Sequence, residues 1–513
     1  MTQATPVKSR ATLIHVGAAL LTGCLYFGAF PGKDGRAWWP LAFVALVPLV
    51  LVVERATPRR AFALGAVAGA TMNILGFWWL VPLLEKFSGF PSAVCALLLF
   101  ALAGAHSLRT ALPCWLTARA ARNGWPFAPS FALAFAAGEL VIPAVFRWNY
   151  AATVSSVTRL IQLADLGGPI LIGVVLVASN LAIAEAINAR VSKRSASRTM
   201  LIVGVAAPLL ALLYGFVRVS SIEASMASAT PLKVGIVQGN APLFGSAEDE
   251  LKSLFTQLNH HRALVRANAG LIVWSEGSMP GSINAEHVED QLLTQLGASK
   301  AASIIGAILV DPAKGRAWNS ALALDNGHLV GRYDKRILLP FSEYIPGGEQ
   351  FPSLYELSPM SGHFTPGDSL KPVMIDGHSV SIAICYEDVL PSLVASLVHE
   401  GHPELLVNLT NDTWFGDSAE PWIHLALARM RAVEHRRYLV RATNSGVSAV
   451  IDPAGRTVAQ GKMFADDSFV TDAHWMTNTT LFSLVGEWPW YGAVVLCVWM
   501  AARRPKVRSS APS

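Results

Sequence analysis

Charged residues are scarce in this chain. They make up 15% of its 513 residues, whereas hydrophobic residues make up 52%. An ordinary soluble domain has about 25% charged residues. Because the composition is too apolar for a chain built only of soluble domains, we expect much of it to lie in lipid.

Motifs for metal ions and nucleotides are missing. The histidines include His260, His261 and His424, but no His-Glu-x-x-His or Cys-x-x-Cys spacing occurs, and these are common spacings of metal ligands. No glycine-rich phosphate loop follows an expected strand. The net charge of +5 is explained by basic loops and a basic tail. We therefore expect no metal, no cofactor and no nucleic-acid partner.

Cysteine is also rare, with five in the chain. Cys24, Cys95, Cys114 and Cys497 fall in long apolar segments, so Cys385 alone lies outside them. An unpaired cysteine in an oxidising compartment indicates a protected or working thiol. However, a lone cysteine at the end of an apolar strand is commonly a small core residue, so the surrounding residues must decide.

Long apolar segments are what the chain has in abundance. A membrane-spanning helix needs about 20 predominantly apolar residues. The expected spans are 11–30, 38–53, 62–83, 92–116, 128–146, 160–187, 200–217 and 481–501. They predict a seven-span transmembrane domain (1–218), a polar domain (219–480), and an eighth transmembrane helix with a basic tail (481–513).

Basic residues alternate between the connections of these segments. Short loops rich in Lys and Arg stay in the cytoplasm. The basic connections hold Lys8, Arg10, Arg55, Arg59, Arg60, Arg119, Arg122, Arg190, Lys193, Arg194, Arg198, Arg503, Arg504, Lys506 and Arg508. The alternation predicts that both termini are cytoplasmic and that 219–480 faces outward. A cleaved signal peptide is the alternative for the first segment, but its removal would spoil the alternation.

Tryptophans and one carboxylate stand out in the membrane region. Those near predicted outer ends of spans are Trp38, Trp39, Trp78, Trp79, Trp148, Trp488 and Trp490. They fit either an ordinary interfacial belt or a lipid-facing vestibule below the outer domain. Glu139 falls inside the fifth span, where an ionisable group marks a functional site by default. A structural hydrogen bond to a neighbouring helix would also explain it.

The polar domain has the texture of an α/β fold. Short β-rich runs alternate with helical stretches, which is typical of such domains. The runs are Lys233–Gln238, Leu271–Trp274, Ser303–Leu309, Ser379–Cys385, Glu404–Asn408 and Ser448–Asp452.

Three residues of this domain form a plausible catalytic set. Glu276 and Cys385 each end an apolar run, and loops at strand ends commonly build α/β active sites. Lys335 could favour the thiolate and stabilise an oxyanion, and Glu276 could accept and return the thiol proton. Glu343 or Glu387 could orient the lysine. For any one of these residues, surface or core packing is the ordinary alternative.

The order Glu276, Lys335, Cys385 resembles the nitrilase (carbon–nitrogen hydrolase) superfamily. With eight spans around such a domain, the chain is similar to the apolipoprotein N-acyltransferase family. The stretches that carry the resemblance are Val-Gln-Gly-Asn (237–240), Lys335 to Pro346, Ile-Cys-Tyr-Glu (384–387), Asn-Asp-Thr-Trp-Phe-Gly (411–416) and Arg-Ala-Thr-Asn-Ser-Gly (441–446).

The resemblance implies a four-layer αββα sandwich and a ping-pong acyl transfer in the bacterial inner membrane, with the catalytic domain on the periplasmic side. The acyl donor would be a phospholipid, and the acceptor the amine of a diacylglyceryl apolipoprotein. Glu343 would support Lys335, and Tyr386, Glu387 and Trp414 would line the pocket.

The chain departs from the family at three places. The loop after Asn240 lacks the tryptophan that the family commonly has there, so Phe244 is the candidate to replace it. Trp148 lies in Phe-Arg-Trp-Asn-Tyr, where the family usually has a Pro-Trp pair, and Ser275 precedes Glu276 in place of proline. These departures concern substrate lining. The competing interpretations are a membrane-anchored nitrilase-type amidase, and a non-catalytic scaffold with a degenerate nitrilase domain.

Overall fold

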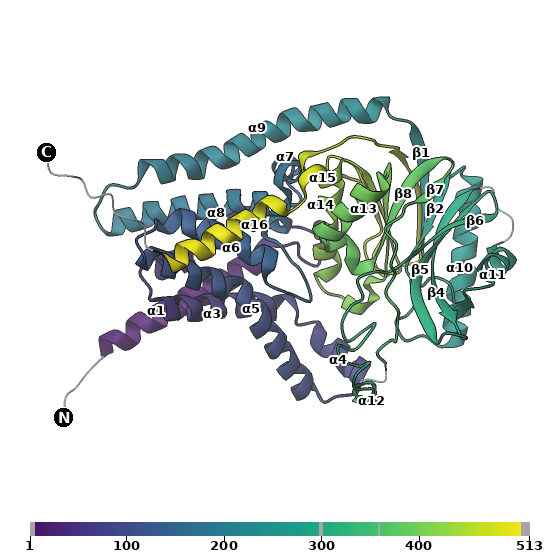
Figure 1. Ribbon diagram of the computed structural model, residues 1–513, viewed down its shortest axis with the longest axis horizontal. Helices are drawn as coiled ribbons and strands as arrows, with labels where there is room; N and C mark the ends of the chain where they lie inside the picture. Colours follow the sequence, from purple (N-terminus) through teal and green to yellow (C-terminus); the bar gives the residue numbers. More distant parts are fainter. Residues whose placement is uncertain (1–5, 297–300, 358–359, 504–513) are drawn as a thin grey trace. The chain divides into compact units, whose positions relative to one another are not determined.

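The computed structural model describes residues 6–296, 301–357 and 360–503, and these form two compact units (Figure 1). Within the described residues, the helical unit comprises 6–81, 91–215 and 487–503, and the sandwich unit comprises 82–90 and the described part of 216–486. Of the basic tail, Arg504, Lys506 and Arg508 lie outside the described residues.

The helical unit is built from apolar helices joined by short connections. They are α1 (Pro6–Ala29), η1 (Trp39–Phe43), α2 (Val47–Val53), α3 (Pro58–Gly76), α5 (Ser92–Arg122), α6 (Phe127–Val141), η2 (Tyr150–Val154), α7 (Thr158–Ile161), α8 (Ala164–Val191), α9 (Arg198–Ser228) and α16 (Trp488–Ala502). α9 continues past Gly215 into the sandwich unit. Small residues allow close packing: a Cβ at Gly65 of α3 would lie 2.8 Å from the carbonyl oxygen of Thr110 on α5.

The number of spans differs from the expectation of eight. Among the described residues, four helices are long and apolar enough to cross a membrane, or five if the bent pair α3 and α4 (Leu80–Ser88) is one span. Trp39–Val53, α6 and α16 are shorter apolar helices. Eight spans therefore remain a prediction.

Prolines explain why two expected spans end early. The span 62–83 breaks after Gly76, with a bend of 64° between α3 and α4. Pro82 lies in the first turn of α4, and it has no N–H to bond the carbonyl oxygen of Trp78 as a continuous helix would require. The span 128–146 ends at Val141, and Ile142 is extended, because the residue before a proline, here Pro143, disfavours helical backbone.

The sandwich unit contains two sheets with the same plan. The first has the order β13-β1-β2-β4-β5-β6, with β3 also paired to β4, and the second has the order β12-β11-β10-β9-β8-β7. Three central strands are parallel in each, β1, β2 and β4 in one and β8, β9 and β10 in the other. The strands are β1 (Pro231–Gln238), β2 (Leu271–Trp274), β3 (Ser282–Asn284), β4 (Ala302–Asp311), β5 (Arg316–Asp325), β6 (His328–Asp334), β7 (Val373–Ile375), β8 (His378–Ile384), β9 (Leu405–Thr410), β10 (Tyr438–Thr443), β11 (Ala449–Ile451), β12 (Thr457–Gln460) and β13 (Asp467–His474).

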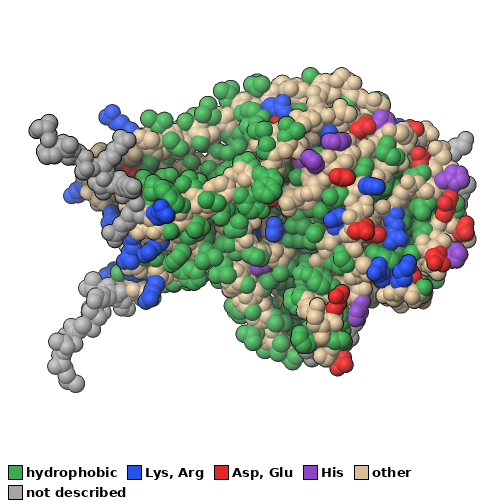
Figure 2. All heavy atoms as spheres, in the orientation of Figure 1, with side chains coloured by type: hydrophobic (Ala, Val, Ile, Leu, Met, Phe, Trp, Pro, Cys, Tyr) green, Lys and Arg blue, Asp and Glu red, His purple; other side chains and the backbone are tan. Residues whose placement is uncertain are grey.

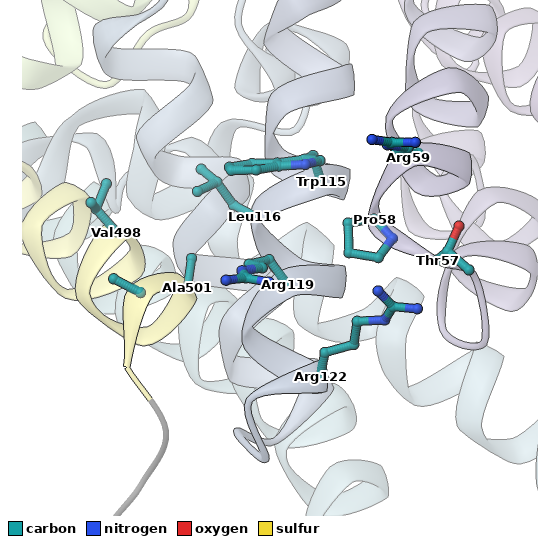
Figure 3. A pocket seen from close by; sticks show the side chains of 10 residues that line it. Thr57, Pro58, Arg59, Trp115, Leu116, Arg119, Arg122, Val498 and Ala501 are labelled. Carbon is teal, nitrogen blue, oxygen red and sulfur yellow. The ribbon is translucent and has the colours of Figure 1, made fainter.

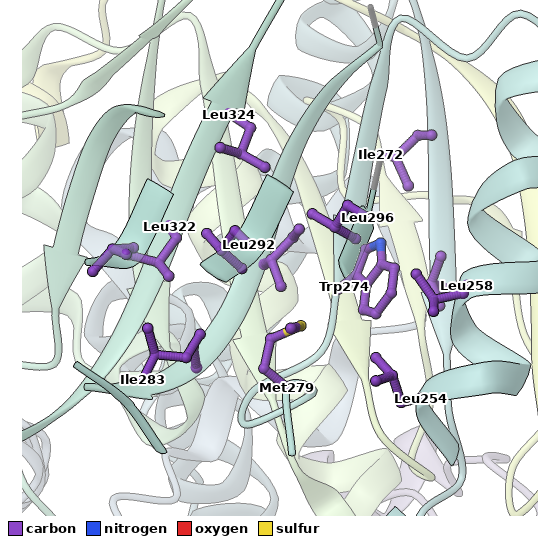
Figure 4. Close-up of a cluster of buried hydrophobic side chains, with 14 of the residues drawn as sticks. Leu254, Leu258, Ile272, Trp274, Met279, Ile283, Leu292, Leu296, Leu322 and Leu324 are labelled. Carbon is purple, nitrogen blue, oxygen red and sulfur yellow. The ribbon is translucent and has the colours of Figure 1, made fainter. Parts of the chain in front are cut away.

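Helices cover the outer face of each sheet, which gives the four layers visible in Figure 1. The helices of this unit that follow β1 are α10 (Ala247–Arg266), α11 (Val288–Leu296), α12 (Ser353–Leu357), η3 (Cys385–Val389), α13 (Pro391–Gly401), η4 (Asp412–Phe415), α14 (Glu420–His435) and α15 (Leu481–Val485), and α10, α11, α13 and α14 are the ones that cover the sheets. α10 and α11 pack on the first sheet through a core around Trp274, Leu292 and Leu322 (Figure 4). α13 and α14 pack on the second through Val394, Leu425 and related residues.

The six expected β-rich runs are confirmed as strands β1, β2, β4, β8, β9 and β11. The α/β nature of the polar domain is therefore correct. The apolar runs in the sequence did not predict strands such as β5, β6 and β10, because these strands carry polar residues that interrupt the apolar pattern.

Candidate active site

Cys385 directly follows β8 and is the first residue of η3. Its φ is +54°, a left-handed conformation that is uncommon for residues other than glycine and concentrates at functional sites. Asn408 on the neighbouring strand β9 donates to the carbonyl oxygens of Cys385 (3.1 Å) and Ala383 (3.2 Å). These bonds hold the turn and fix the cysteine at the carboxyl end of β8.

Lys335 follows β6 directly and is buried. Its ammonium nitrogen lies 2.8 Å from Oε2 of Glu343 and 3.6 Å from Oε1 of Glu276. Burial lowers the pKa of Lys335, but Glu343, Cys385 and Glu276 outweigh burial and raise this pKa well above its ordinary value. Lys335 is therefore a charged ammonium between two carboxylates and close to the thiol.

Asn319 on β5 joins these two carboxylates. Its Nδ2 donates to Oε1 of Glu276 (2.7 Å) and to Oε1 of Glu343 (3.0 Å). Its backbone oxygen accepts from the N–H of Lys335 at 2.8 Å. The sequence analysis missed Asn319, because its side-chain partners lie 43 and 24 residues away and no local pattern marks it.

The position of the Glu276 backbone requires a glycine on the adjacent strand β4. A Cβ at Gly306 of β4 would overlap the carbonyl oxygen of Ser275 and lie 2.8 Å from Cα of Glu276. The Cys385 thiol lies within hydrogen-bonding reach of the Glu276 carboxylate. Oε2 of this carboxylate is buried and has no hydrogen-bond partner among the described residues. Glu276 thus has an oxygen available to the thiol.

The electrostatics favour a protonated cysteine at rest. Burial raises the pKa of the Cys385 thiol, and the Glu276 carboxylate raises it further, while Lys335 acts in the opposite direction without reversing the shift. Burial also raises the pKa of Glu276, against the effect of Lys335. Lys335 therefore does not by itself create a thiolate, so attack by the sulfur requires a base, and Glu276 is within reach.

Glu343 and Glu387 make different contacts. Glu343 accepts from the ammonium of Lys335. Glu387 is fully buried and accepts from the backbone N–H groups of Arg336 (2.7 Å) and Ile384 (2.8 Å). Glu387 therefore ties the loop after Lys335 to the turn at Cys385.

A buried charge cluster, formed by Asp388, Asp412, His424 and Arg441, lies beside this turn. His424 contacts Asp388 at 2.9 Å and Asp412 at 3.0 Å, and Arg441 contacts the same aspartates at 3.3 and 3.1 Å. Burial lowers the pKa of His424, but the aspartates outweigh burial and raise it to about 9. Since Asp388 belongs to η3 and Asp412 begins η4, the charge cluster joins the two turns. Sequence reasoning missed it, because the Asp412–Arg441 pair spans 29 residues.

Aromatic rings gather at η4. The ring of Trp414 lies 5.9 Å from Phe87 and 6.4 Å from Phe244. Phe244 is 44% exposed, and Trp414 and Tyr386 are half-buried. The structure thus brings Phe244 against Trp414, where the two rings offer an apolar surface.

Glu139 and Trp148 belong to the helical unit. Glu139 accepts from the backbone N–H of Tyr150 at 2.7 Å. Trp148 is 4% exposed, and its ring packs against Phe30 and Phe77. Arg109 donates to the backbone oxygens of Trp148 (2.6 Å) and Glu139 (3.2 Å). Glu139 thus accepts one backbone hydrogen bond from η2, while its Oε2 is buried without a partner among the described residues. Trp148 packs inside the helical unit rather than in an exposed belt. A functional role for either residue stays a prediction.

Metal-ligating side chains do not cluster in the part of the chain that the structure describes. No group of three or more His, Cys, Asp or Glu residues there could hold a metal ion. The histidine of the charge cluster has both ring nitrogens engaged by carboxylates.

Comparison with known proteins identifies the family. Residues 233–473 match the carbon–nitrogen hydrolase family, and residues 22–182 match the apolipoprotein N-acyltransferase N-terminal domain. The apolipoprotein N-acyltransferase of Azotobacter vinelandii is 31% identical, over 92% of this chain and 92% of its own length. The chain belongs to the apolipoprotein N-acyltransferase family. Another member, from Pseudomonas syringae pv. tomato, is 30% identical over 88% of this chain and 90% of its own length.

A solved structure is similar to about half of this chain. The nitrilase-superfamily amidase of Nesterenkonia has 18% sequence identity to this chain, covers 48% of this chain and 93% of its own, and has a TM-score of 0.36. Membership of the apolipoprotein N-acyltransferase family makes the protein an acyltransferase with a nitrilase-like unit.

Proposed function

We propose that this protein transfers an acyl chain from a membrane phospholipid, typically phosphatidylethanolamine, to the N-terminal amine of an S-diacylglyceryl cysteine in apolipoproteins. The observation that carries the proposal is the grouping of Glu276, Lys335 and Cys385 at the ends of β2, β6 and β8, in a chain of this family.

The first half-reaction forms a thioester on Cys385. The sulfur attacks the ester carbonyl of the phospholipid while Glu276 takes the thiol proton. The ammonium of Lys335 stabilises the negative oxygen of the tetrahedral intermediate. The C–O bond then breaks, and Glu276 returns the proton to the oxygen of the departing lysophospholipid.

The second half-reaction transfers the acyl chain to nitrogen. The neutral amine of the apolipoprotein attacks the thioester carbonyl, Lys335 again stabilises the oxyanion, and the C–S bond breaks. Glu276 takes a proton from the amine nitrogen and returns it to the cysteine sulfur. The Phe244–Trp414 surface and Tyr386 would contact the lipid parts, and exclusion of water there would favour the amine over hydrolysis.

The proposed setting is the bacterial inner membrane. There, the helical unit would span the bilayer eight times with both termini cytoplasmic, and 219–480 would be periplasmic. The apolar helices and the alternation of basic connections support this topology. With the site at the outer leaflet, the acyl tails of both substrates can stay in lipid while their reacting groups reach Cys385.

An acceptor competition tests the function. Purified protein with phosphatidylethanolamine is offered a diacylglyceryl-cysteine peptide or the same peptide without lipid, and the N-acyl products are measured by mass spectrometry. We expect transfer to the lipidated peptide alone. Free fatty acid as the main product, or hydrolysis of short soluble amides, would instead identify a nitrilase-type amidase.

A further inference from the structure

A cavity of about 800 Å³ opens at one end of the helical unit. It lies between the first turn of α3, the last two turns of α5 and the end of α16, and none of the candidate catalytic residues lines it. In Figure 3, Arg122 reaches toward the first turn of α3 and Arg119 lies on the side of α16. The volume falls in the range of small-molecule sites, about 300–1,000 Å³.

Three arginines line the cavity without carboxylate partners. Arg59, Arg119 and Arg122 are exposed, and none forms an ion pair with a described residue. Arg119 and Arg122 lie three residues apart on α5, so they share one face of the helix. Two carboxylates of the same helical unit have other partners, because Glu54 accepts from Asn188 and Glu185 pairs with Arg194. The cavity therefore concentrates positive charge that no carboxylate of the described residues neutralises by an ion pair.

The remaining walls of the cavity are apolar. Trp115 and Val498 line it and are 37% and 52% exposed. Binding of a soluble anion alone would not require these exposed apolar side chains. A guanidinium cluster beside an exposed apolar surface instead fits a molecule with a charged head and a hydrocarbon chain.

The helices that form the cavity are fixed to one another. Asn123 after α5 donates to the backbone oxygen of Ala501 on α16 at 2.7 Å, and Trp125 donates to that of Arg503 at 2.7 Å. The rings of Trp125 and Trp499 lie 5.0 Å apart. These contacts hold the α5 and α16 walls of the cavity together.

We propose that this cavity binds the phosphate head group of an anionic glycerophospholipid, of which phosphatidylglycerol is the simplest example. One guanidinium group can donate two parallel N–H···O hydrogen bonds to the oxygens of one phosphate. The acyl chains would lie along Trp115 and the exposed face of α16. The cavity is at the end of the helices where Lys and Arg side chains gather (Figure 2), which is the expected cytoplasmic surface. Because none of the candidate catalytic residues lines this cavity, the inference does not depend on the proposed function.

Native mass spectrometry of the full chain in neutral detergent tests the site. Phosphatidylglycerol and phosphatidylethanolamine with identical acyl chains are titrated separately against wild type and the Arg119→Gln/Arg122→Gln variant. The matched control is Arg190→Gln/Arg198→Gln, which removes the same charge from the ends of α8 and α9, where neither residue lines the cavity. Arg119→Lys/Arg122→Lys keeps the charge without the guanidinium fork.

We expect wild type and the control to prefer phosphatidylglycerol about tenfold, the Gln variant to lose this preference, and the Lys variant to retain part of it. Equal losses in the Gln variant and the control would overturn the site, since they would mean unspecific attraction to basic loops. Equal binding of both lipids by wild type would overturn it too. Binding of inorganic phosphate without binding of the lipid would contradict the lipid assignment. A melting temperature unchanged by mutation shows that the variants are folded.

Discussion

The protonated state of His424 makes the stability of the sandwich unit depend on pH. The two aspartates raise the pKa of His424 to about 9, from an ordinary value of 6.5. Because the pKa of His424 is higher in the folded state, its protonated ring stabilises the fold fully below pH 6.5, and this stabilisation is lost as pH rises through about 9. The difference of roughly 2.5 pKa units corresponds to about 3 kcal/mol of unfolding free energy, at about 1.4 kcal/mol per unit. His424→Gln removes this charge, so we expect a variant that is less stable at pH 6.5 and whose stability changes little between pH 6.5 and 9.5.

Thermal unfolding of the full chain in detergent checks this prediction. Protease cleavage followed by mass spectrometry reports the sandwich unit separately from the helices. For a unit of this size, about 3 kcal/mol corresponds to a fall in melting temperature of roughly 6–12 °C. His328→Gln is the matched control, because its ring is exposed and contacts Glu289 at the surface. The reasoning is refuted if wild type and His424→Gln lose stability in parallel from pH 6.5 to 9.5.

Three further substitutions test the surroundings of the site. Asn319→Ala leaves two buried carboxylates short of a donor, so the rate of thioester formation should fall at least tenfold and the free energy of unfolding by about 1–3 kcal/mol. Single-turnover kinetics and a melting curve would detect these losses. A wild-type rate in the variant would show that the hydrogen bonds from Asn319 to the two carboxylates are dispensable. Gly306→Ala should cost about 1–3 kcal/mol by overpacking and impair acylation, whereas Gly270→Ala, whose Cβ would meet a side chain at 3.4 Å, should be nearly neutral in the same melt. Phe244→Ala removes the ring that faces Trp414 and should raise KM for phospholipid while Phe244→Trp retains it; an unchanged KM in both would exclude lipid contact there.

The sequence was sufficient for the class of fold and for the grouping of the main candidate residues. Apolar β-rich runs stand out locally, and Glu276 and Cys385 directly follow two of them. Because parallel strands expose their carboxyl ends at one edge of a sheet, residues in such places are natural neighbours. Glu343 was also placed correctly against Lys335.

The supporting residues could not be predicted in the same way. Asn319 and the charge cluster depend on side-chain pairs between distant segments, and polar residues on strands carry no local sign of their partners. The clearance at Gly306 depends on how β4 lies beside the turn after β2. Composition identified the apolar segments, but the break between α3 and α4 and the end of α6 before Pro143 fall inside expected spans.

The most direct test of the central claim is the intact mass of the purified protein after incubation with phosphatidylethanolamine, with wild type and Cys385→Ala compared side by side. The account predicts a mass increase of one acyl chain in wild type and none in the variant, since the thioester forms on the Cys385 sulfur. Equal acylation of the variant would contradict this account. So would an unacylated wild type in which a small alkylating reagent still modifies Cys385.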